Sequence, residues 1–282
     1  TNKLCLPIIL EKIPNLLNSL IIQIKSGEEN KNIETCTYIW EKMIEQDFDR
    51  NSILINLGGG MIGDIGGFCA STFKRGIDFI QIPTTLLAMT DASIGGKLGV
   101  DFNSFKNTIG LVKDPKSVLI YPEFIKTQKK EDLLFSFIEV IKHALIDDLK
   151  LWKYIKKTRF EDLIWQEIIS KSVEIKNNIV LEDPNEKRQR KKLNFGHTFG
   201  HAIESFYLQQ GTPIMHGQAI ALGILLEIRL SKLSQEEERE ITEYILSTFS
   251  LPNTPKKSKL LPFLVNDKKN INGKINFSLL NG

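Results

Sequence analysis

Histidine and cysteine are scarce in this sequence of 282 residues, which contains four histidines and three cysteines. Cys5, Cys36 and Cys69 are odd in number and widely spaced, and no two of them form a C-x-x-C pair. This pattern is not that of a secreted domain held together by disulfides. It indicates reduced thiols and predicts a cytoplasmic protein.

Long apolar segments and a strong charge of either sign are also absent. No run reaches 18 apolar residues and no basic-then-apolar leader is present, so the sequence predicts neither a transmembrane helix nor a secretory signal. Lys and Arg number 37 against 34 Asp and Glu, which gives a net charge of +3. This charge suits a small anionic substrate and does not demand a nucleic acid. The composition is that of a globular chain long enough for two modest domains.

The first third of the chain carries a strand, a cluster of glycines and a helix in succession. Residues 52–57 form an apolar run typical of a buried parallel strand. Six glycines follow within residues 58–67, and helical spacing continues to Phe73. Glycines let a backbone approach a pyrophosphate closely, and a helix N-terminus supplies free N–H groups. The spacing departs from G-x-G-x-x-G, so we predict a variant dinucleotide loop, with a merely tight strand–helix turn as the alternative.

Hydrophobic periodicity predicts the other elements of this α/β region. The expected helices cover residues 16–21 and 38–44, and the expected strands cover 22–24, 77–82 and 117–121.

Polar side chains gather after the strand at 77–82 and in the loops that follow, including a glycine-containing loop at 101–110. The carboxyl ends of parallel strands are where α/β sheets bind ligands, and these donors suit anionic oxygens. By default, however, a single lysine is a solvated surface charge. The hydroxyl, amide and cationic groups concerned belong to Thr84, Thr85, Lys97, Lys106 and Asn107, and Arg75, just before the strand, is a further candidate.

Helical patterns dominate from about residue 129. Residues 183–185 break the pattern, 186–192 form a charge run that reads as solvated, 252–262 resemble a linker, and 275–279 alternate like a strand. The expected helices cover residues 130–146, 148–157, 161–182, 197–208, 214–233 and 235–249.

Two of the four histidines, His197 and His201, lie four positions apart and share one face of an expected helix. His216 follows after a turn, while Glu139 and Lys142 lie one helical turn apart upstream. Imidazoles and a carboxylate from separate helices form catalytic zinc sites with an open position. The alternative is a set of core histidines that bind nearby carbonyls. We therefore predict an α/β, Rossmann-like nucleotide-binding domain at 1–128 and an all-α metal-binding domain at 129–282, with the site in the cleft between them.

Four motifs together closely resemble the 3-dehydroquinate synthase family of the sugar-phosphate cyclase superfamily. The likeness is collinear over essentially the whole chain, and the combination is highly specific. The motifs are Leu57-Gly-Gly-Gly-Met-Ile-Gly-Asp64, Gln81-Ile-Pro-Thr-Thr-Leu-Leu-Ala88, Asp91-Ala-Ser-Ile-Gly-Gly-Lys97 and Asn194-Phe-Gly-His-Thr-Phe-Gly-His-Ala-Ile-Glu204.

The resemblance implies a role for each matching residue. The metal, Zn²⁺ with Co²⁺ as the alternative, would be held by Glu139, His197 and His216. His201 would not bind the metal, and would either support its ligands or contact substrate. NAD would be bound by Glu28, Lys31, Gly60, Met61, Ile62, Gly63, Asp64, Thr84, Thr85, Asp91, Lys97, Lys106, Asn107 and Thr127. The remaining substrate contacts would come from Arg75, Lys142, Lys176, Arg190, Asn194 and Lys268.

The family are lyases of the shikimate pathway of aromatic amino acid biosynthesis. The resemblance implies conversion of 3-deoxy-D-arabino-heptulosonate 7-phosphate to 3-dehydroquinate and phosphate by oxidation, elimination, reduction and an intramolecular aldol reaction, with NAD⁺ regenerated. It also implies a cytoplasmic homodimer that acts on a small sugar phosphate, without a nucleic acid or membrane partner.

The sequence departs from the family pattern at four places without removing a proposed ligand. Phe135-Ser136 replaces Ser-Gly, Phe105 replaces the glycine before Lys106-Asn107, Gln218 replaces the glutamate of His-Gly-Glu, and Lys187-Arg188 replaces loop glycines.

Three other functions remain open. A related cyclase that makes an aminocyclitol or valiolone ring would alter the groups that meet the substrate carboxylate, whereas Lys142, Lys176, Arg190 and Asn194 are retained here. A polyol or glycerol-phosphate dehydrogenase would release NADH. A non-catalytic metal-binding protein would keep the ligands without turnover.

Overall fold

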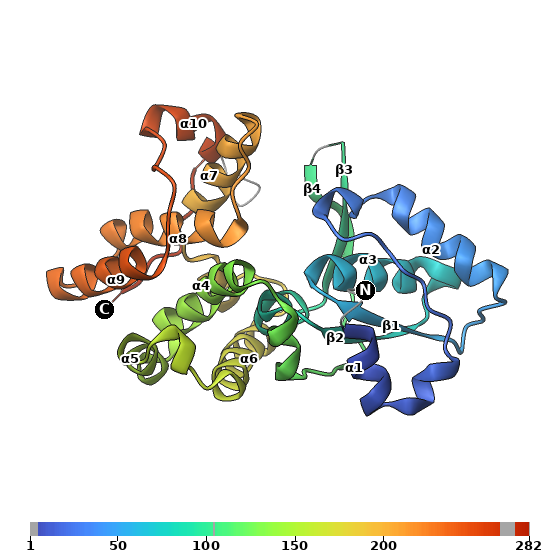
Figure 1. Cartoon of the computed structure of the whole chain (residues 1–282). Coiled ribbons are helices and arrows are strands. Elements are labelled where there is room, and N and C mark those ends of the chain that lie inside the picture. The colour runs from blue at the N-terminus through green and yellow to red at the C-terminus, as the bar shows by residue number, and fades with distance from the viewer. Residues whose placement is uncertain (1–4, 104, 266–273, 282) are drawn as a thin grey trace. The chain divides into compact units, whose positions relative to one another are not determined.

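The computed structural model describes residues 5–103, 105–265 and 274–281 (Figure 1). The chain divides into two compact units, residues 1–129 and 130–282. The first contains parallel strands and helices, and the second is helical in the part described, so the α/β and all-α fold classes expected from the sequence are confirmed.

A parallel sheet organises the first unit. Strands β1 (Ile53–Gly58), β2 (Asp78–Pro83) and β5 (Ser117–Val118) lie in the order β1-β2-β5. The strand expected at 117–121 is therefore present but short. Gly58 is in register with Pro83, and Thr84 N–H donates to Gly58 O at 2.9 Å. The carboxyl ends of β1 and β2 consequently share one edge, where the glycine loop and Thr84 meet.

Helix α3 (Gly60–Thr72) follows β1 directly, and neighbouring side chains pack against its backbone at two glycines. A Cβ added at Gly66 would lie 1.9 Å from Asn56 Oδ1, and one at Gly67 would lie 2.4 Å from Leu98 Cδ2. A larger residue at either position would have to displace these side chains. The close packing places the N-terminus of α3 at the carboxyl edge of the sheet.

The glycine-containing loop expected at 101–110 is instead a β-hairpin. Strands β3 (Lys97–Phe102) and β4 (Phe105–Val112) pair antiparallel, with Gly99 opposite Gly110. A Cβ at Gly110 would lie 2.3 Å from Leu98 O. These glycines allow two strands to approach each other, a role that the sequence pattern does not distinguish from a turn.

The N-terminal segments differ from expectation. The helix expected at 16–21 is only a 3₁₀ turn, η1 (Pro14–Asn18), and residues 22–24 form no strand. Ile22 and Ile24 instead pack, partly buried, against the apolar core. The remaining helical elements are α1 (Cys5–Lys12), η2 (Glu28–Asn30), α2 (Ile33–Glu45), η3 (Phe73–Arg75), the π-helical η4 (Ala88–Ala92) and η5 (Pro122–Thr127).

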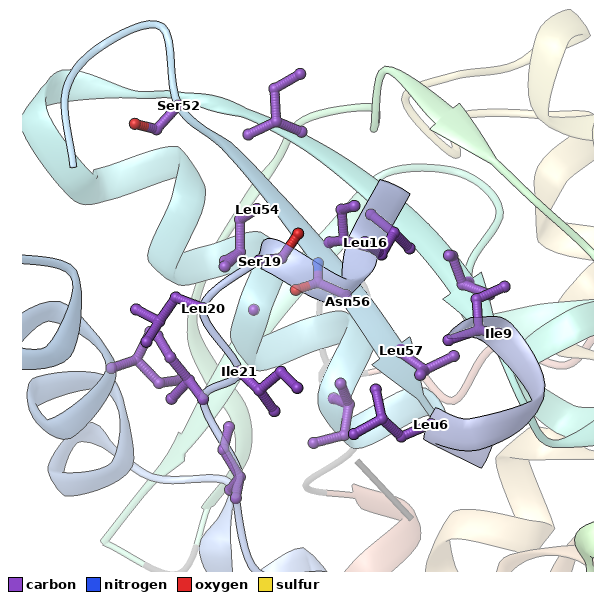
Figure 2. Close-up of a pocket in the computed structure, with 18 of the residues that line it drawn as sticks. Leu6, Ile9, Leu16, Ser19, Leu20, Ile21, Ser52, Leu54, Asn56 and Leu57 are labelled. Atoms are coloured by element: carbon purple, nitrogen blue, oxygen red, sulfur yellow. The ribbon is translucent and has the colours of Figure 1, made fainter. Parts of the chain in front are cut away.

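An apolar cavity of about 400 Å³ lies beside β1 (Figure 2). Leu6, Ile9, Leu16 and Leu54 contribute to its walls. None of the described residues lining it is charged. A phosphorylated sugar needs cationic or N–H donors, so this cavity is not suited to such a substrate.

Seven α-helices are described in the second unit. Those expected between 130 and 249 are confirmed, although the helix expected at 161–182 begins only at Trp165 and the helix expected at 214–233 covers only His216–Glu227. The region expected to be a linker contains a helix, and no strand forms at 275–279. The helices are α4 (Lys130–Asp147), α5 (Leu149–Lys157), α6 (Trp165–Glu182), α7 (His197–Gln209), α8 (His216–Glu227), α9 (Gln235–Thr248) and α10 (Lys257–Val265). The 3₁₀ turns are η6 (Phe160–Asp162), η7 (Gln189–Asn194) and η8 (Ile228–Leu230).

Glycines bring α4, α7 and α8 into backbone contact. A Cβ added at Gly223 of α8 would lie 1.9 Å from Gly196 O, and one at Gly217 would lie 2.0 Å from Phe135 O of α4. Neither position tolerates a side chain without displacing a helix. Among the described helices of the chain, none is long and apolar enough to cross a membrane.

Candidate metal centre and nucleotide loop

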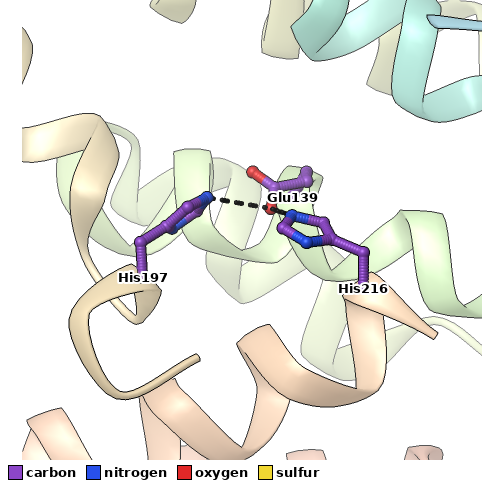
Figure 3. Close-up of side chains that lie close together, drawn as sticks. All are labelled: Glu139, His197 and His216. Carbon is purple, nitrogen blue, oxygen red and sulfur yellow. Dashed lines mark ion pairs between the residues drawn. The ribbon is translucent and has the colours of Figure 1, made fainter. Parts of the chain in front are cut away.

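Glu139, His197 and His216 come together from three helices (Figure 3). Glu139 lies in the middle of α4, while His197 and His216 are the first residues of α7 and α8. Glu139 Oε1 lies 3.6 Å from His197 Nε2 and 3.9 Å from His216 Nε2. One ligand atom from each residue lies within 4.8 Å of the other two. The three therefore surround a volume that a single cation would fill.

The potential ligand atoms of Glu139, His197 and His216 face one another without forming hydrogen bonds to one another. Glu139 Oε1 is buried and has no hydrogen-bond partner. His197 Nδ1 lies 3.0 Å from Phe195 O, which can only accept, so Nδ1 carries the proton and Nε2 the lone pair. An orphaned carboxylate oxygen facing imidazole lone pairs fits a divalent metal, and two imidazoles with one carboxylate are ligands that zinc prefers.

A second carboxylate orients His216. Glu204 Oε2 lies 3.0 Å from His216 Nδ1, which directs Nε2 towards Glu139. Carboxylates in this position fix the ring and raise the basicity of a ligating histidine. The sequence reasoning assigned Glu204 no role. Its spacing seven residues after His197 on one helix face was the signal that could have identified it.

The protonation state of His197 also suits a ligand. Burial lowers its pKa well below the usual value, the Lys142 charge acts in the same direction, and protonation of His201 or His216 would add to the effect. The imidazole is therefore neutral at pH 7 and offers its lone pair.

Lys142 and His201 lie beside the trio. Lys142 Nζ is ion-paired with Glu139 Oε2, and both side chains are 1% exposed. The two oxygens of Glu139 thus differ, since one is held by Lys142 and the other faces the imidazoles. The His201 ring centroid lies 5.3 Å from that of His197 and 6.1 Å from that of His216. His201 borders the trio but is not part of its ligand set.

The other expected substrate residues of this unit lie on α6 and η7. Lys176 and Arg190 are buried. Arg190 Nη1 donates to Pro184 O at 2.8 Å, and Asn194 Nδ2 donates to Glu186 Oε1 at 2.6 Å. Lys268 lies outside the described residues.

The loop that carries Arg190 is organised by one carboxylate. Asp183 accepts the backbone N–H groups of Lys187 at 2.9 Å, of Arg188, and of Arg190 at 3.2 Å. These bonds and the nearby Arg190 charge lower the pKa of Asp183 against the opposing effect of its burial. The charge run at 186–192 is therefore an ordered turn, with Arg190 buried within it.

In the first unit, four expected NAD contacts form one polar cluster. Lys31, 3% exposed, donates to Asp64 Oδ2 and Asn107 Oδ1, each at 2.6 Å, and its Nζ lies 3.8 Å from Glu28 Oε1. Burial raises the pKa of Asp64 to about 6, although the Lys31 charge opposes the shift. Asn107 is further fixed by its N–H bond to Asp101 Oδ1 at 2.7 Å.

The glycine loop forms a second group of expected NAD contacts. Gly60, Met61, Ile62 and Gly63 are the first residues of α3, and the N-cap Gly59 provides no side-chain cap. A Cβ at Gly59 would lie 3.2 Å from Thr85 Cγ2. Free N–H groups at a helix N-terminus, bordered by hydroxyls, form an anion-binding arrangement.

The remaining expected residues are more dispersed. Asp91 lies in η4, Lys97 and Lys106 are exposed on the hairpin, and Arg75 has a left-handed backbone, with φ +69°. Thr127 Oγ1 donates to Phe124 O at 2.7 Å, so its hydroxyl is used within η5.

The fold is shared with synthases whose structures hold NAD⁺ and a divalent metal. 2-Deoxy-scyllo-inosose synthase, solved with carbaglucose-6-phosphate, NAD⁺ and Co²⁺, matches with a TM-score of 0.83 at 25% identity, covering 96% of this chain and 76% of that one. 2-Epi-5-epi-valiolone synthase of Streptomyces hygroscopicus subsp. jinggangensis, solved with NAD⁺ and Zn²⁺, matches with a TM-score of 0.76 at 25% identity, covering 86% of this chain and 70% of that one.

Sequence comparison identifies the family to which the chain belongs. The model for the N-terminal part of 3-dehydroquinate synthase matches residues 21–134, and that for its C-terminal part matches 136–270. A 3-dehydroquinate synthase of Parabacteroides distasonis is 39% identical over 292 residues, covering 99% of this chain and 82% of that protein. The chain belongs to the 3-dehydroquinate synthase family of phosphate-eliminating lyases.

Proposed function

We propose that this protein converts 3-deoxy-D-arabino-heptulosonate 7-phosphate to 3-dehydroquinate and phosphate, using NAD⁺ and Zn²⁺, or Co²⁺ in its place. The observation that carries the proposal is the orphaned Glu139 oxygen facing the Nε2 atoms of His197 and His216. The 39% identity to a 3-dehydroquinate synthase supports the choice of reaction.

The residues of the second unit would bind the substrate and control its protons. Glu139, His197 and His216 would hold the metal, which supplies Lewis-acid polarisation of a substrate hydroxyl when bound. Lys142, Lys176, Arg190, Asn194 and the undescribed Lys268 would hold the substrate's phosphate and carboxylate, since cationic and amide donors recognise such anions. His201 would contact the reacting part of the substrate.

The first unit would bind NAD. The loop at residues 60–64 would hold the pyrophosphate at the N-terminus of α3, through the first-turn N–H groups that precede Gly63, whose own N–H is bonded to Gly59 O. Other contacts would come from the cluster of Glu28, Lys31, Asp64 and Asn107, and from Thr84, Thr85, Asp91, Lys97, Lys106 and Thr127. Arg75 would add a substrate contact. We propose residues 1–128 as this NAD-binding domain and 129–282 as the metal- and substrate-binding domain.

A coupled assay tests the reaction directly. The protein is incubated with NAD⁺, Zn²⁺ and 3-deoxy-D-arabino-heptulosonate 7-phosphate, and both inorganic phosphate and absorbance at the NADH band are followed. Phosphate release without net NADH is expected, because the hydride returns to the product. Net NADH would indicate a dehydrogenase, and absence of phosphate release would contradict the proposal.

A substrate panel separates the related cyclases. Glucose 6-phosphate and sedoheptulose 7-phosphate lack the carboxylate that Lys176 and Arg190 are proposed to help hold. We expect turnover of the heptulosonate to exceed theirs by at least about 100-fold, since an unmet buried charge costs several kcal/mol. Comparable turnover would point to a related cyclase.

We further propose a cytoplasmic homodimer. Light scattering after size-exclusion chromatography would give twice the chain mass, and fractionation of the source cells would recover the protein with soluble cytoplasmic markers. A monomer mass would contradict the assembly.

A further inference from the structure

Glu227, the last residue of α8, is a fully buried carboxylate outside the metal trio, with 0% exposure. Its Oε2 accepts the backbone N–H of Gly196 at 2.7 Å. Its Oε1 accepts the backbone N–H groups of Thr198 at 3.0 Å and Phe199 at 3.2 Å. All three donors belong to the N-terminus of α7, immediately before and after His197.

Helix α7 has no cap of its own. Its N-cap residue is Gly196, with φ +79° and no side chain to accept the free N–H groups of the first turn. A larger residue is excluded at this position, because a Cβ would lie 2.5 Å from Ile224 Cγ1. The left-handed φ disfavours other residues as well. The cap must therefore come from elsewhere in the chain, and Glu227 supplies it.

The cap acts on the part of the helix that carries a ligand. His197 is the first residue of α7, a position at which helices fray. The ring is oriented by the bond from Nδ1 to Phe195 O at 3.0 Å, so its direction depends on the backbone of residues 195–199. A negative charge at the positive end of the helix, bound to three N–H groups, holds that backbone in place.

We propose that Glu227 is the positioning residue for the metal ligand His197. This inference rests on the proposed metal-dependent function. Helix α8 then contributes twice to the centre, because it begins with the ligand His216 and ends with the carboxylate that fixes the helix of His197.

Metal binding by the purified full-length chain tests the proposal without turnover. Zn²⁺ affinity is measured by competition with a chromophoric chelator for wild type, Glu227→Gln and Glu227→Ala. The amide of Gln cannot accept from both sets of N–H groups, since its NH₂ would face a donor. We expect a 10- to 100-fold weaker affinity for both variants, the range for loss of a residue that supports a metal ligand.

Ser234→Ala is the matched control. Ser234 caps α9 by accepting the N–H of Glu237 at 3.2 Å, and it belongs to none of the proposed sites. Its loss should lower Tm and leave Zn²⁺ affinity unchanged. A shared loss of affinity in Ser234→Ala and Glu227→Gln would show a merely global effect and overturn the positioning role.

Two further readouts are local. The visible d–d bands of the Co²⁺-loaded protein should shift in Glu227→Gln and not in Ser234→Ala. Amide hydrogen exchange of residues 196–199 in the metal-free protein should accelerate in Glu227→Gln, a measurement that remains valid if Glu227→Ala does not fold. If Glu227→Gln has the same Zn²⁺ affinity, Co²⁺ spectrum and exchange rates as wild type, the positioning role is overturned and the metal-dependent function stands. If wild type itself fails to retain Zn²⁺, the metal-dependent function is overturned as well.

Discussion

The two polar clusters of this protein handle buried charge in opposite ways. In the first unit, Lys31 bonds to both Asp64 and Asn107, so the charges and dipoles there satisfy one another. In the second unit, Lys142 holds one oxygen of Glu139 and leaves the other without a hydrogen bond. A self-satisfied cluster gains little from a cation, whereas an orphaned buried oxygen is stabilised by one. The comparison distinguishes a cluster whose members satisfy one another from a centre that leaves a buried carboxylate oxygen available to a cation.

The largest expected effect is on metal binding in the second unit. His197→Ala removes one of three proposed ligands and should abolish Zn²⁺ retention, with a loss of at least about 100-fold in affinity. His201→Ala should spare it, because His201 borders the ligand set without belonging to it. Zinc content after dialysis, measured by elemental analysis, checks both variants. Equal metal loss in the two would contradict the assignment of ligands.

Lys142→Met should give the next largest effect. In metal-free protein, this substitution leaves the Glu139 carboxylate, which is 1% exposed, without its cation. Loss of one partner of a buried ion pair lowers the free energy of unfolding by about 3–5 kcal/mol. Added Zn²⁺ should restore more stability to this variant than to wild type. Urea unfolding with chelator and with Zn²⁺ measures both. An equal gain from Zn²⁺ in the two proteins would be inconsistent with a shared carboxylate.

Lys31→Met is the corresponding change in the first unit and should cost less, about 1–3 kcal/mol. Asp64 is 19% exposed and can take up a proton once Lys31 is gone, which relieves the unpaired charge. The pKa of Asp64 should rise above about 6, because the opposing cation is removed. Urea unfolding and carbon NMR of the carboxyl group check the result. Zn²⁺ should stabilise this variant as it does wild type.

The smallest expected effect is a difference in pH dependence between the clusters. Burial raises the pKa of Asp64 from 3.8 to about 6, so ionisation penalises the folded state, and stability from this group is lost as pH rises from about 4 to about 6. This loss in the free energy of unfolding is on the order of 1–2 kcal/mol after allowance for the partial exposure of Asp64. The lowered pKa of His197 acts in the opposite sense in metal-free protein, since stability is lost as pH falls below 6.5.

The Asp64→Asn variant isolates the contribution of Asp64 to the pH dependence of stability. The amide oxygen can still accept from Lys31 but cannot titrate. The free energy of unfolding is measured for both proteins as a function of pH. The wild-type value minus the Asp64→Asn value should fall between pH 4 and pH 6 and then level off. A difference that grows with pH across this range would mean that Asp64 is stabilised as the carboxylate.

Much of the fold followed from local sequence patterns. The apolar runs before Gly58 and Pro83 predicted strands, and the helical periodicity from residue 130 predicted α4 to α9, because burial of one face imposes a period on the sequence. The hairpin of β3 and β4 was missed because Gly99 and Gly110 act through close approach of two strands. Residues 22–24 and 275–279 have strand-like patterns but form no strand, since an alternating segment also needs a partner edge.

The sequence by itself determined the family, the fold class and a short list of candidate ligands, because the motifs and periodicities that specify them are local. Only the tertiary structure decided how those residues are paired. Lys31 meets Asn107 across 76 positions, and Glu227 caps the helix of His197 from about 30 positions away. The cap depends on how closely α7 and α8 approach, which is set by Gly196 and Gly223. No local pattern encodes that approach, because it is a property of two packed surfaces together.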